Sequence, residues 1–149
     1  MKLLNEMTLQ VKSLSVNEGF VRSAIAAFCV EANPTLDEIT DIKTAVSEAV
    51  TNCVVHAYPN SVGDILIKVK LFENKVDISI TDYGQGIDDI EQAKEPFYTT
   101  KPEQERSGMG FTVMESFMDE FSVEKNRGKG ITVRMTKNIG SEQKQAIGV

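Results

Sequence analysis

Apolar and polar positions alternate near the start of the chain and then change to a helical period. Met7, Leu9 and Val11 alternate with polar residues, which predicts a strand over residues 5–13. The stretch "SVNE" at 15–18 has the Ser-x-x-Glu form of a capping box and predicts the start of a helix. The apolar stripe of this helix is Phe20, Val21, Ala24, Ile25 and Phe28.

A second helix is expected after Pro34, because the residue before a proline disfavours the helical conformation and should end the first one. The stretch "TLDE" at 35–38 repeats the capping-box form. Helical spacing then continues to about residue 57. The predicted buried side of this helix is Leu36, Ile39, Ile42, Val46, Ala49, Val50 and Cys53.

The rest of the chain alternates between strand patterns and polar connections. "DILIKVKLFE" and "KVDISITD" have the period of two typical of strands, and "ENK" between them predicts a hairpin turn. Residues 83–108 are polar and rich in Gly and Pro, a length more typical of a functional lid than of a passive connection. "GFTVMESFMDEF" predicts a short helix, and residues 121–137 predict a last hairpin that turns at "NRGKG".

This order of elements predicts an α+β fold in which one mixed, mostly antiparallel sheet carries helices on one face, as a two-layer sandwich. A doubly wound fold is excluded, because it needs strands and helices in alternation. We expect a single domain over residues 1–137. Residues 138–149 lack periodicity and are predicted to be a disordered tail.

Composition and charge narrow the function. The 149 residues carry 16 Lys+Arg and 22 Asp+Glu, a net charge of −6, which argues against direct nucleic-acid binding and against an anionic membrane surface. The chain has neither a signal-peptide pattern nor a membrane-spanning apolar run, so we expect a cytoplasmic protein. Cys29 and Cys53 lie in apolar helical patterns and are predicted to be buried thiols; one His and no CxxC disfavour a structural zinc site.

Glu48, Asn52 and His56 follow one another at four-residue spacing, so they share one stripe of the second helix. An amide oxygen is a hard ligand suited to Mg²⁺, which binds few protein groups. A carboxylate one turn earlier could accept a proton from a hydroxyl that attacks a bound phosphate. From these residues alone, the alternative is an ordinary solvated helix edge.

Asp82 ends an apolar strand, and Gly84 and Gly86 follow it. A carboxylate held at a strand end can accept a hydrogen bond from an exocyclic amine such as that of adenine. Glycines without side chains would allow the backbone to approach a flat ring. The alternative interpretation is a simple turn.

Two further clusters have the composition of phosphate-binding sites. "SGMGF" at 107–111 would expose backbone N–H groups at a helix N-terminus, although no Walker A lysine follows. Before it, Thr99, Thr100, Lys101 and Arg106 offer hydroxyls and cations for phosphate. A chance Gly-x-Gly and a mixed-charge loop are the alternatives when each cluster is considered by itself.

The order of these clusters resembles the Bergerat-type ATP-binding fold, shared by gyrase-type topoisomerases, a heat-shock chaperone, histidine kinases and the MutL repair protein. The stretches "SEAVTN", "FYTTKPE" and "ERSGMGFTVMESFMD" are most similar to bacterial anti-sigma serine kinases, in particular those that act on sigma-F in endospore formers. The resemblance covers about residues 4–137. One departure is Ile131 after Gly130, where many relatives have Thr.

The resemblance implies a role for each matched residue. Glu48 is expected to be the general base, Asn52 the Mg²⁺ ligand, and Asp82 the acceptor for the adenine amino group. The other residues implied to contact ATP or ADP are Gly84, Gly86, Thr99, Thr100, Lys101, Arg106, Ser107, Gly108, Met109, Gly110, Phe111 and Thr132. His56 lies two helical turns from Glu48 and is interpreted as structural.

The resemblance also implies partners. They are a sigma factor, expected to be sigma-F, an anti-anti-sigma protein whose serine is phosphorylated, and a second copy of the chain in a homodimer. Arg22 lies off the apolar stripe of the first helix and is the candidate contact for the sigma factor and its antagonist; the alternative is an idle surface arginine. Glu48 favours phosphorylation of a serine or threonine, or hydrolysis, because an attacking hydroxyl benefits from a base and an imidazole does not need one. Two alternatives stay open: a stress-response anti-sigma kinase of the same family, and a non-catalytic module in which the nucleotide only gates sigma binding.

Overall fold

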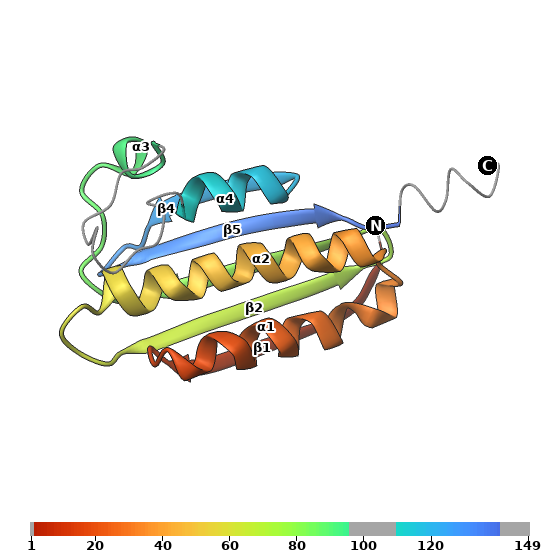
Figure 1. Ribbon diagram of the computed structural model, residues 1–149, viewed down its shortest axis with the longest axis horizontal. Coiled ribbons are helices and arrows are strands. Elements are labelled where there is room, and N and C mark those ends of the chain that lie inside the picture. The colour runs from red at the N-terminus through yellow and green to blue at the C-terminus, as the bar shows by residue number, and fades with distance from the viewer. Residues whose placement is uncertain (1, 96–109, 141–149) are drawn as a thin grey trace.

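The computed structural model describes residues 2–95 and 110–140, which fold into a sheet with helices on one face (Figure 1). The strands are β1 Leu3–Lys12, β2 Asp64–Phe72, β3 Lys75–Asp82, β4 Glu120–Lys125 and β5 Ile131–Asn138. The helices are α1 Val16–Phe28, α2 Leu36–Asn52, α3 Ile90–Ala93 and α4 Gly110–Phe117, with a short 3₁₀ helix η1 Cys29–Ala32 and a π-helix η2 Cys53–Ala57. The predicted α+β two-layer fold is confirmed.

The five strands lie in the order β1-β2-β3-β5-β4, and all four pairings are antiparallel. The parallel component of the predicted mixed sheet is therefore wrong for the part of the chain that the structure describes. Two helices separate β1 from β2, so the chain crosses the sheet twice and β2 starts at the end where β1 stops. Neighbouring strands with that connection must run in opposite directions.

The core lies between the sheet and the layer formed by α1, α2 and α4. Inward positions of β2 recur with period two, and Ile65, Ile67, Val69 and Leu71 are all fully buried. The buried stripe of α2, which includes Ile42, packs on this face. Each large aliphatic side chain buried in this way contributes roughly 1.5–3 kcal/mol through the hydrophobic effect.

Only one of the two predicted capping boxes forms. Thr35 accepts a hydrogen bond from the N–H of Glu38 at 3.1 Å, and the Glu38 carboxylate accepts from the N–H of Thr35 at 2.7 Å. Ser15 has helical dihedral angles and makes no side-chain cap, so the prediction for "SVNE" is wrong. An N-cap side chain reaches the first turn only from an extended backbone, as at Thr35.

Two residues of the predicted apolar stripes are exposed instead of buried. Leu36 is 81% exposed because it is the first residue of α2, and Phe20 on α1 is 55% exposed. Val21 and Ile25 carry the buried side of α1 instead. The apolar period indicated the correct buried face of each helix. The stripe of residues that is buried in the structure is narrower than the stripe of apolar residues in the sequence.

The structure also changes the limits of two irregular segments. A four-residue helix, α3, lies within the predicted lid and is capped by Asp89, whose carboxylate accepts a hydrogen bond from the N–H of Gln92 at 3.0 Å. Part of the predicted tail is packed: Ile139 is 1% exposed, and the N–H of Gly140 donates to Glu38. The remainder of that predicted tail, 141–149, lies outside the described residues.

Candidate functional site

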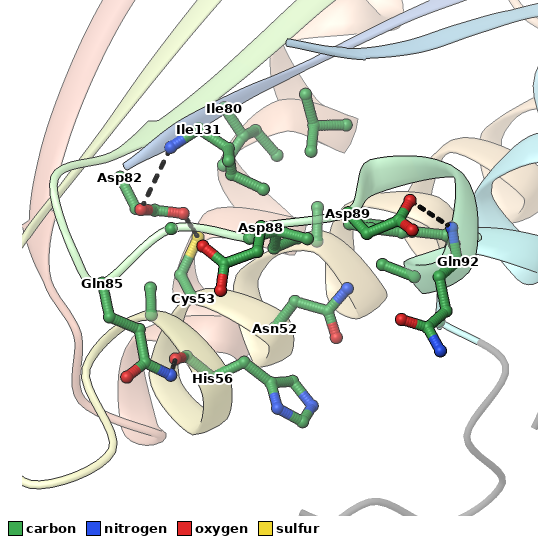
Figure 2. A pocket seen from close by; sticks show the side chains of 18 residues that line it. Asn52, Cys53, His56, Ile80, Asp82, Gln85, Asp88, Asp89, Gln92 and Ile131 are labelled. Carbon is green, nitrogen blue, oxygen red and sulfur yellow. Dashed lines mark hydrogen bonds between the residues drawn. The ribbon is translucent and has the colours of Figure 1, made fainter. Parts of the chain in front are cut away.

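A cavity of about 360 Å³ lies at one end of α2, in the size range of small-molecule sites (Figure 2). Its walls come from α2 and η2, the ends of β3 and β5, the segment that follows β3, and the first residues of α4. The apolar lining is Ala49, Cys53, Ala57, Ile80, Ile87, Ala93, Phe111, Ile131 and Val133. Asn52, His56, Asp82, Gln85, Asp88, Asp89 and Gln92 supply the polar groups.

Asp82, the last residue of β3, is a carboxylate with only 3% of its surface exposed. Its Oδ1 accepts hydrogen bonds from the N–H of Gly84 at 3.1 Å and of Ile131 at 3.4 Å. Burial raises the pKa of Asp82, and these two backbone hydrogen bonds oppose the rise. The sequence therefore predicted the position of a cavity-lining acceptor correctly.

Cys53 lies beside this carboxylate, with Sγ 3.9 Å from Oδ2 of Asp82 (Figure 2). Burial, and next the nearby charge of Asp82, raise the pKa of the Cys53 thiol, so it stays protonated and can donate. Both Cys29 and Cys53 are free and buried, as predicted. The position of Cys53 in the cavity wall was not predicted, because its place on the apolar stripe indicated only burial.

Asn52 ends α2 and lines the cavity between Asp82 and Asp89 (Figure 2). Gly110, the first residue of α4, approaches it so closely that an added Cβ would lie 3.0 Å from both Nδ2 and Oδ1 of Asn52. A single amide oxygen beside open cavity volume fits Mg²⁺, which keeps several water ligands. Glu48 is half-buried one turn earlier on α2 and is not among the described lining residues.

His56 lines the cavity, which the interpretation of this residue as purely structural did not anticipate. It lies in η2, where the helix widens from α to π geometry, a change that is frequent at functional sites. A distance of two helical turns from Glu48 does not exclude His56 from the cavity, because a cavity that follows α2 and η2 can be lined by residues that far apart. The four-residue spacing from Asn52 was the signal that could have found it.

The two glycines after Asp82 serve different purposes. Gly86 lines the cavity and has φ +78°, a conformation that favours glycine. Gly84 does not line it; a Cβ there would lie 2.1 Å from the carbonyl oxygen of Ala57. The close approach observed at Gly84 is to the end of η2.

Substituting Gly84 tests this packing. Gly84→Ala is expected to lower the free energy of unfolding by about 1–3 kcal/mol, because backbone atoms must move to accommodate the methyl group. Gly128→Ala is the matched control, since nothing lies within 4 Å of a Cβ at Gly128. Urea denaturation of both variants measures the difference. Equal stability of the two variants would contradict the close contact with Ala57.

Gln85 connects the segment after Asp82 to the end of η2. Its N–H donates to the carbonyl of Ala57 at 3.0 Å, and its Nε2 donates to the carbonyl of His56 at 2.7 Å. These carbonyls belong to a helix end, where they have no partner within the helix. Gln85 was missed, because no local pattern indicates that a glutamine satisfies carbonyls 28 residues or more away in the chain.

Thr132 does not line the cavity, which corrects the expectation that it contacts adenine. Side chains alternate along β5, and its neighbours Ile131 and Val133 are the ones that face the cavity. The Thr132 hydroxyl lies 2.9 Å from that of Thr81, its partner on β3. Both hydroxyls therefore lie on the opposite face of the sheet.

The remaining predicted residues divide into two groups. Gly110 and Phe111 both line the cavity. Thr99, Thr100, Lys101, Arg106, Ser107, Gly108 and Met109 lie outside the described residues. Arg22 is on α1, half-buried and paired with Glu18 at 3.3 Å, and is not part of the cavity lining.

Asp89 and Gln92 add polar groups at the end of the cavity away from Asp82 (Figure 2), and Asp88 is a further acidic lining residue. The N-cap pattern Asp-x-x-Gln, which begins α3, was the local signal that could have placed two of them. Within residues 2–95 and 110–140, no group of three or more His, Cys, Asp or Glu could hold a metal ion. No helix of the described part is long and apolar enough to cross a bilayer.

The cavity is an apolar slot with the Asp82 carboxylate as an acceptor at one end. The start of α4, the Asn52 amide and the His56 imidazole lie along its walls. A flat heterocycle with an exocyclic amine matches the slot and its acceptor. An anionic group matches the start of α4, since N–H groups at a helix N-terminus attract anions. These two requirements are met together in an adenine nucleotide.

Comparisons with known proteins agree with this geometry. The family model of the histidine kinase-like ATPase domain matches residues 13–137. An anti-sigma F factor from Thermoanaerobacter sp. (strain X514) is 54% identical over 143 residues, which is 96% of this chain and 100% of the relative. An anti-sigma F factor from Bacillus subtilis (strain 168) is 49% identical over 140 residues, 93% of this chain and 96% of the relative.

Among solved structures, that of the RsbU and RsbW domains of a Mycobacterium tuberculosis protein is similar in fold. It has a TM-score of 0.65 and 19% sequence identity, and the match covers 91% of this chain. The chain spans 32% of that longer chain. At this level of identity the similarity supports the fold alone.

Proposed function

The chain belongs to the anti-sigma F factor family and to the wider family of histidine kinase-like ATPase domains, and on this premise we propose its activity. It is an ATP-dependent protein-serine kinase of the cytoplasm that also sequesters a sigma factor, sigma-F. The substrate is the anti-anti-sigma protein that opposes sequestration. Phosphorylating this antagonist would keep the sigma factor inhibited.

The observation that carries the nucleotide part is the position of Asp82. A carboxylate that is 3% exposed accepts from two backbone N–H groups and the Cys53 thiol at the end of an apolar slot, and it keeps acceptor capacity for a further donor. The amino group of adenine supplies that donor, while guanine would present a carbonyl oxygen to the carboxylate. The cavity therefore favours ATP and ADP over guanine nucleotides.

The phosphate end is proposed to be formed by Asn52 and the start of α4. Mg²⁺ would be held by the Asn52 amide oxygen and would neutralise phosphate charge when bound. Glu48 lies one turn before Asn52 on the same stripe of α2, so its carboxylate could approach a serine placed at a phosphate bound near Asn52. It would accept the serine proton as the oxygen attacks the γ-phosphorus and ADP leaves.

The partner-binding part rests on α1 and on the charge of the molecule. The net charge of −6 favours contacts with proteins over contacts with DNA. Arg22 has 40% of its side chain exposed and pairs with Glu18, and Phe20, also on α1, is 55% exposed. Arginine and aromatic residues are both enriched at protein interfaces. We propose this surface for the sigma factor and its antagonist, and a homodimer as the assembly that binds them.

Arg22→Ala is therefore expected to weaken capture of sigma-F by about tenfold or more, as at interface positions where an arginine is an anchor. ADP affinity should not change, because Arg22 is not part of the cavity lining. Calorimetry with purified sigma-F and with ADP measures both properties. Lys43→Ala, on α2, is the control for the loss of one positive charge. Sedimentation of the parent protein tests the proposed homodimer.

The experiment that tests the function uses ATP labelled at the γ-phosphate, Mg²⁺, this protein and a purified anti-anti-sigma protein. Transfer of acid-stable label to the second protein supports serine or threonine phosphorylation. Acid-labile label would indicate histidine chemistry and overturn the role of Glu48. Nucleotide binding with no transfer would favour the alternative, a module in which the nucleotide only gates sigma binding.

A further inference from the structure

We propose that Asn126, in the turn between β4 and β5, is a positioning residue for base recognition, although its contacts lie outside the cavity. It holds the main chain of Asp82 and the turn that donates to the Asp82 carboxylate. This inference rests on the proposed function, since it assumes that Asp82 accepts a hydrogen bond from adenine. It adds a residue to base recognition that neither motif nor cavity lining indicates.

The Asn126 side chain joins three segments. Its Nδ2 donates to the carbonyl oxygen of Asp82 at 2.8 Å and to that of Lys129 at 3.0 Å. Its Oδ1 accepts from the hydroxyl of Thr132 at 2.7 Å. The Asn126 N–H also closes the turn by donating to the carbonyl of Gly130 at 3.0 Å. One side chain therefore connects the turn, β5 and the end of β3.

The carbonyl of Asp82 needs this donor because the β3–β5 ladder ends one residue earlier. The last pair in the register is Thr81 with Thr132, so Asp82 has no paired residue on β5. A buried backbone carbonyl without a donor is costly. The Asn126 amide takes the place of the next ladder hydrogen bond and holds the strand end in position.

The orientation of the Asn126 amide follows from its neighbours. Both hydrogens of Nδ2 point at carbonyl oxygens, which only accept, so the reversed amide would place Oδ1 against two acceptors. Thr132 can then donate to Oδ1 and remain within 2.9 Å of the Thr81 hydroxyl. The residue predicted to contact adenine, Thr132, instead supports the residue that positions Asp82.

The position of the turn reaches the carboxylate through two neighbouring residues. Gly130 has φ +88°, and a Cβ there would lie 2.1 Å from the carbonyl oxygen of Asp82. The next residue, Ile131, donates its N–H to Oδ1 of Asp82 at 3.4 Å and lines the cavity (Figure 2). If Asn126 releases the strand end, Asp82 loses both a fixed backbone and one of the donors that orient its carboxylate.

The test compares ADP with its analogue that lacks the 6-amino group, purine riboside diphosphate, by calorimetry. The parent protein is expected to prefer ADP by about 10- to 100-fold, the range for a hydrogen bond to a charged acceptor. In Asn126→Ala this preference should shrink to about threefold or less, since a displaced carboxylate no longer distinguishes the two bases. If Asn126 had a merely structural role, Asn126→Ala would weaken the binding of both ligands equally and leave the ratio of their affinities unchanged.

Arg127→Ala, in the same turn with an exposed side chain, is the matched control and should keep the parent ratio. An unchanged ratio in folded Asn126→Ala would overturn the inference. If Asn126→Ala does not fold, Thr132→Val removes the donor to Oδ1 and leaves the amide in place; its ratio should fall, and an unchanged ratio would again overturn the inference. A parent protein that binds ADP and the analogue equally would instead contradict the adenine contact of the proposed function.

Discussion

Glu48→Gln is expected to lower phosphotransfer by about a hundred- to ten-thousandfold, the usual contribution of a general base. The amide keeps the size and hydrogen-bonding shape of the carboxylate but cannot accept a proton. ADP affinity should not change, because Glu48 is not among the described lining residues of the cavity. Single-turnover transfer of labelled phosphate, at saturating ATP and antagonist, measures the chemical step separately from binding.

Glu120→Gln, on an exposed position of β4, is the matched control for removing one negative charge from an acidic protein. It should transfer phosphate at the parent rate. If Glu48→Gln is as active as this control, Glu48 is not the base. If Glu48→Gln instead loses ADP binding, the residue acts in the nucleotide site.

Asp82→Asn is expected to lower ADP affinity by about 10- to 100-fold, because a neutral amide replaces the charged acceptor. The substitution changes the volume very little, so the slot around the base should persist. Calorimetry with ADP and GDP measures the effect. Asp77→Asn, on the opposite face of the same strand, is the control and should leave ADP affinity unchanged. Parent-like ADP binding in Asp82→Asn would contradict the acceptor role.

The same substitution should have the opposite effect on stability without nucleotide. Burial raises the pKa of Asp82 above its ordinary value of 3.8, so the folded state binds this proton more tightly than the unfolded state. Stability contributed by Asp82 therefore falls as pH rises from about 4 through the folded-state pKa. Asp82→Asn removes this cost, and the variant should gain stability relative to the parent at neutral pH and lose that gain near pH 4. Urea denaturation at both pH values measures it.

A carboxylate that destabilises the empty protein and binds the ligand is a common compromise at functional sites. Its cost is reduced by Gly84 and Ile131, which donate to it, and by Cys53 beside it. Nucleotide binding should offset the remaining free-energy cost of the buried carboxylate, because a ligand that binds only the folded state stabilises that state.

Local patterns in the sequence determined the elements and the class of the fold. Strand and helix periods depend on backbone geometry within a few residues, and they placed β2, β3 and α2 close to their observed limits. The same local geometry put Glu48 and Asn52 on one stripe and Asp82 at a strand end. Motif order then sufficed to indicate the family, which the comparisons confirm.

The tertiary structure alone decided which side chains meet. Thr132 turned away from the cavity because the register of β5 against β3 assigns its side chain to the opposite face of the sheet. Gln85 reached the carbonyls of Ala57 and His56 at the end of η2, and Asn126 reached Asp82 across 44 positions. Such contacts depend on how strands pair and on where a turn closes. Those are energies of packing and hydrogen bonding between distant segments, which no local period in the sequence records.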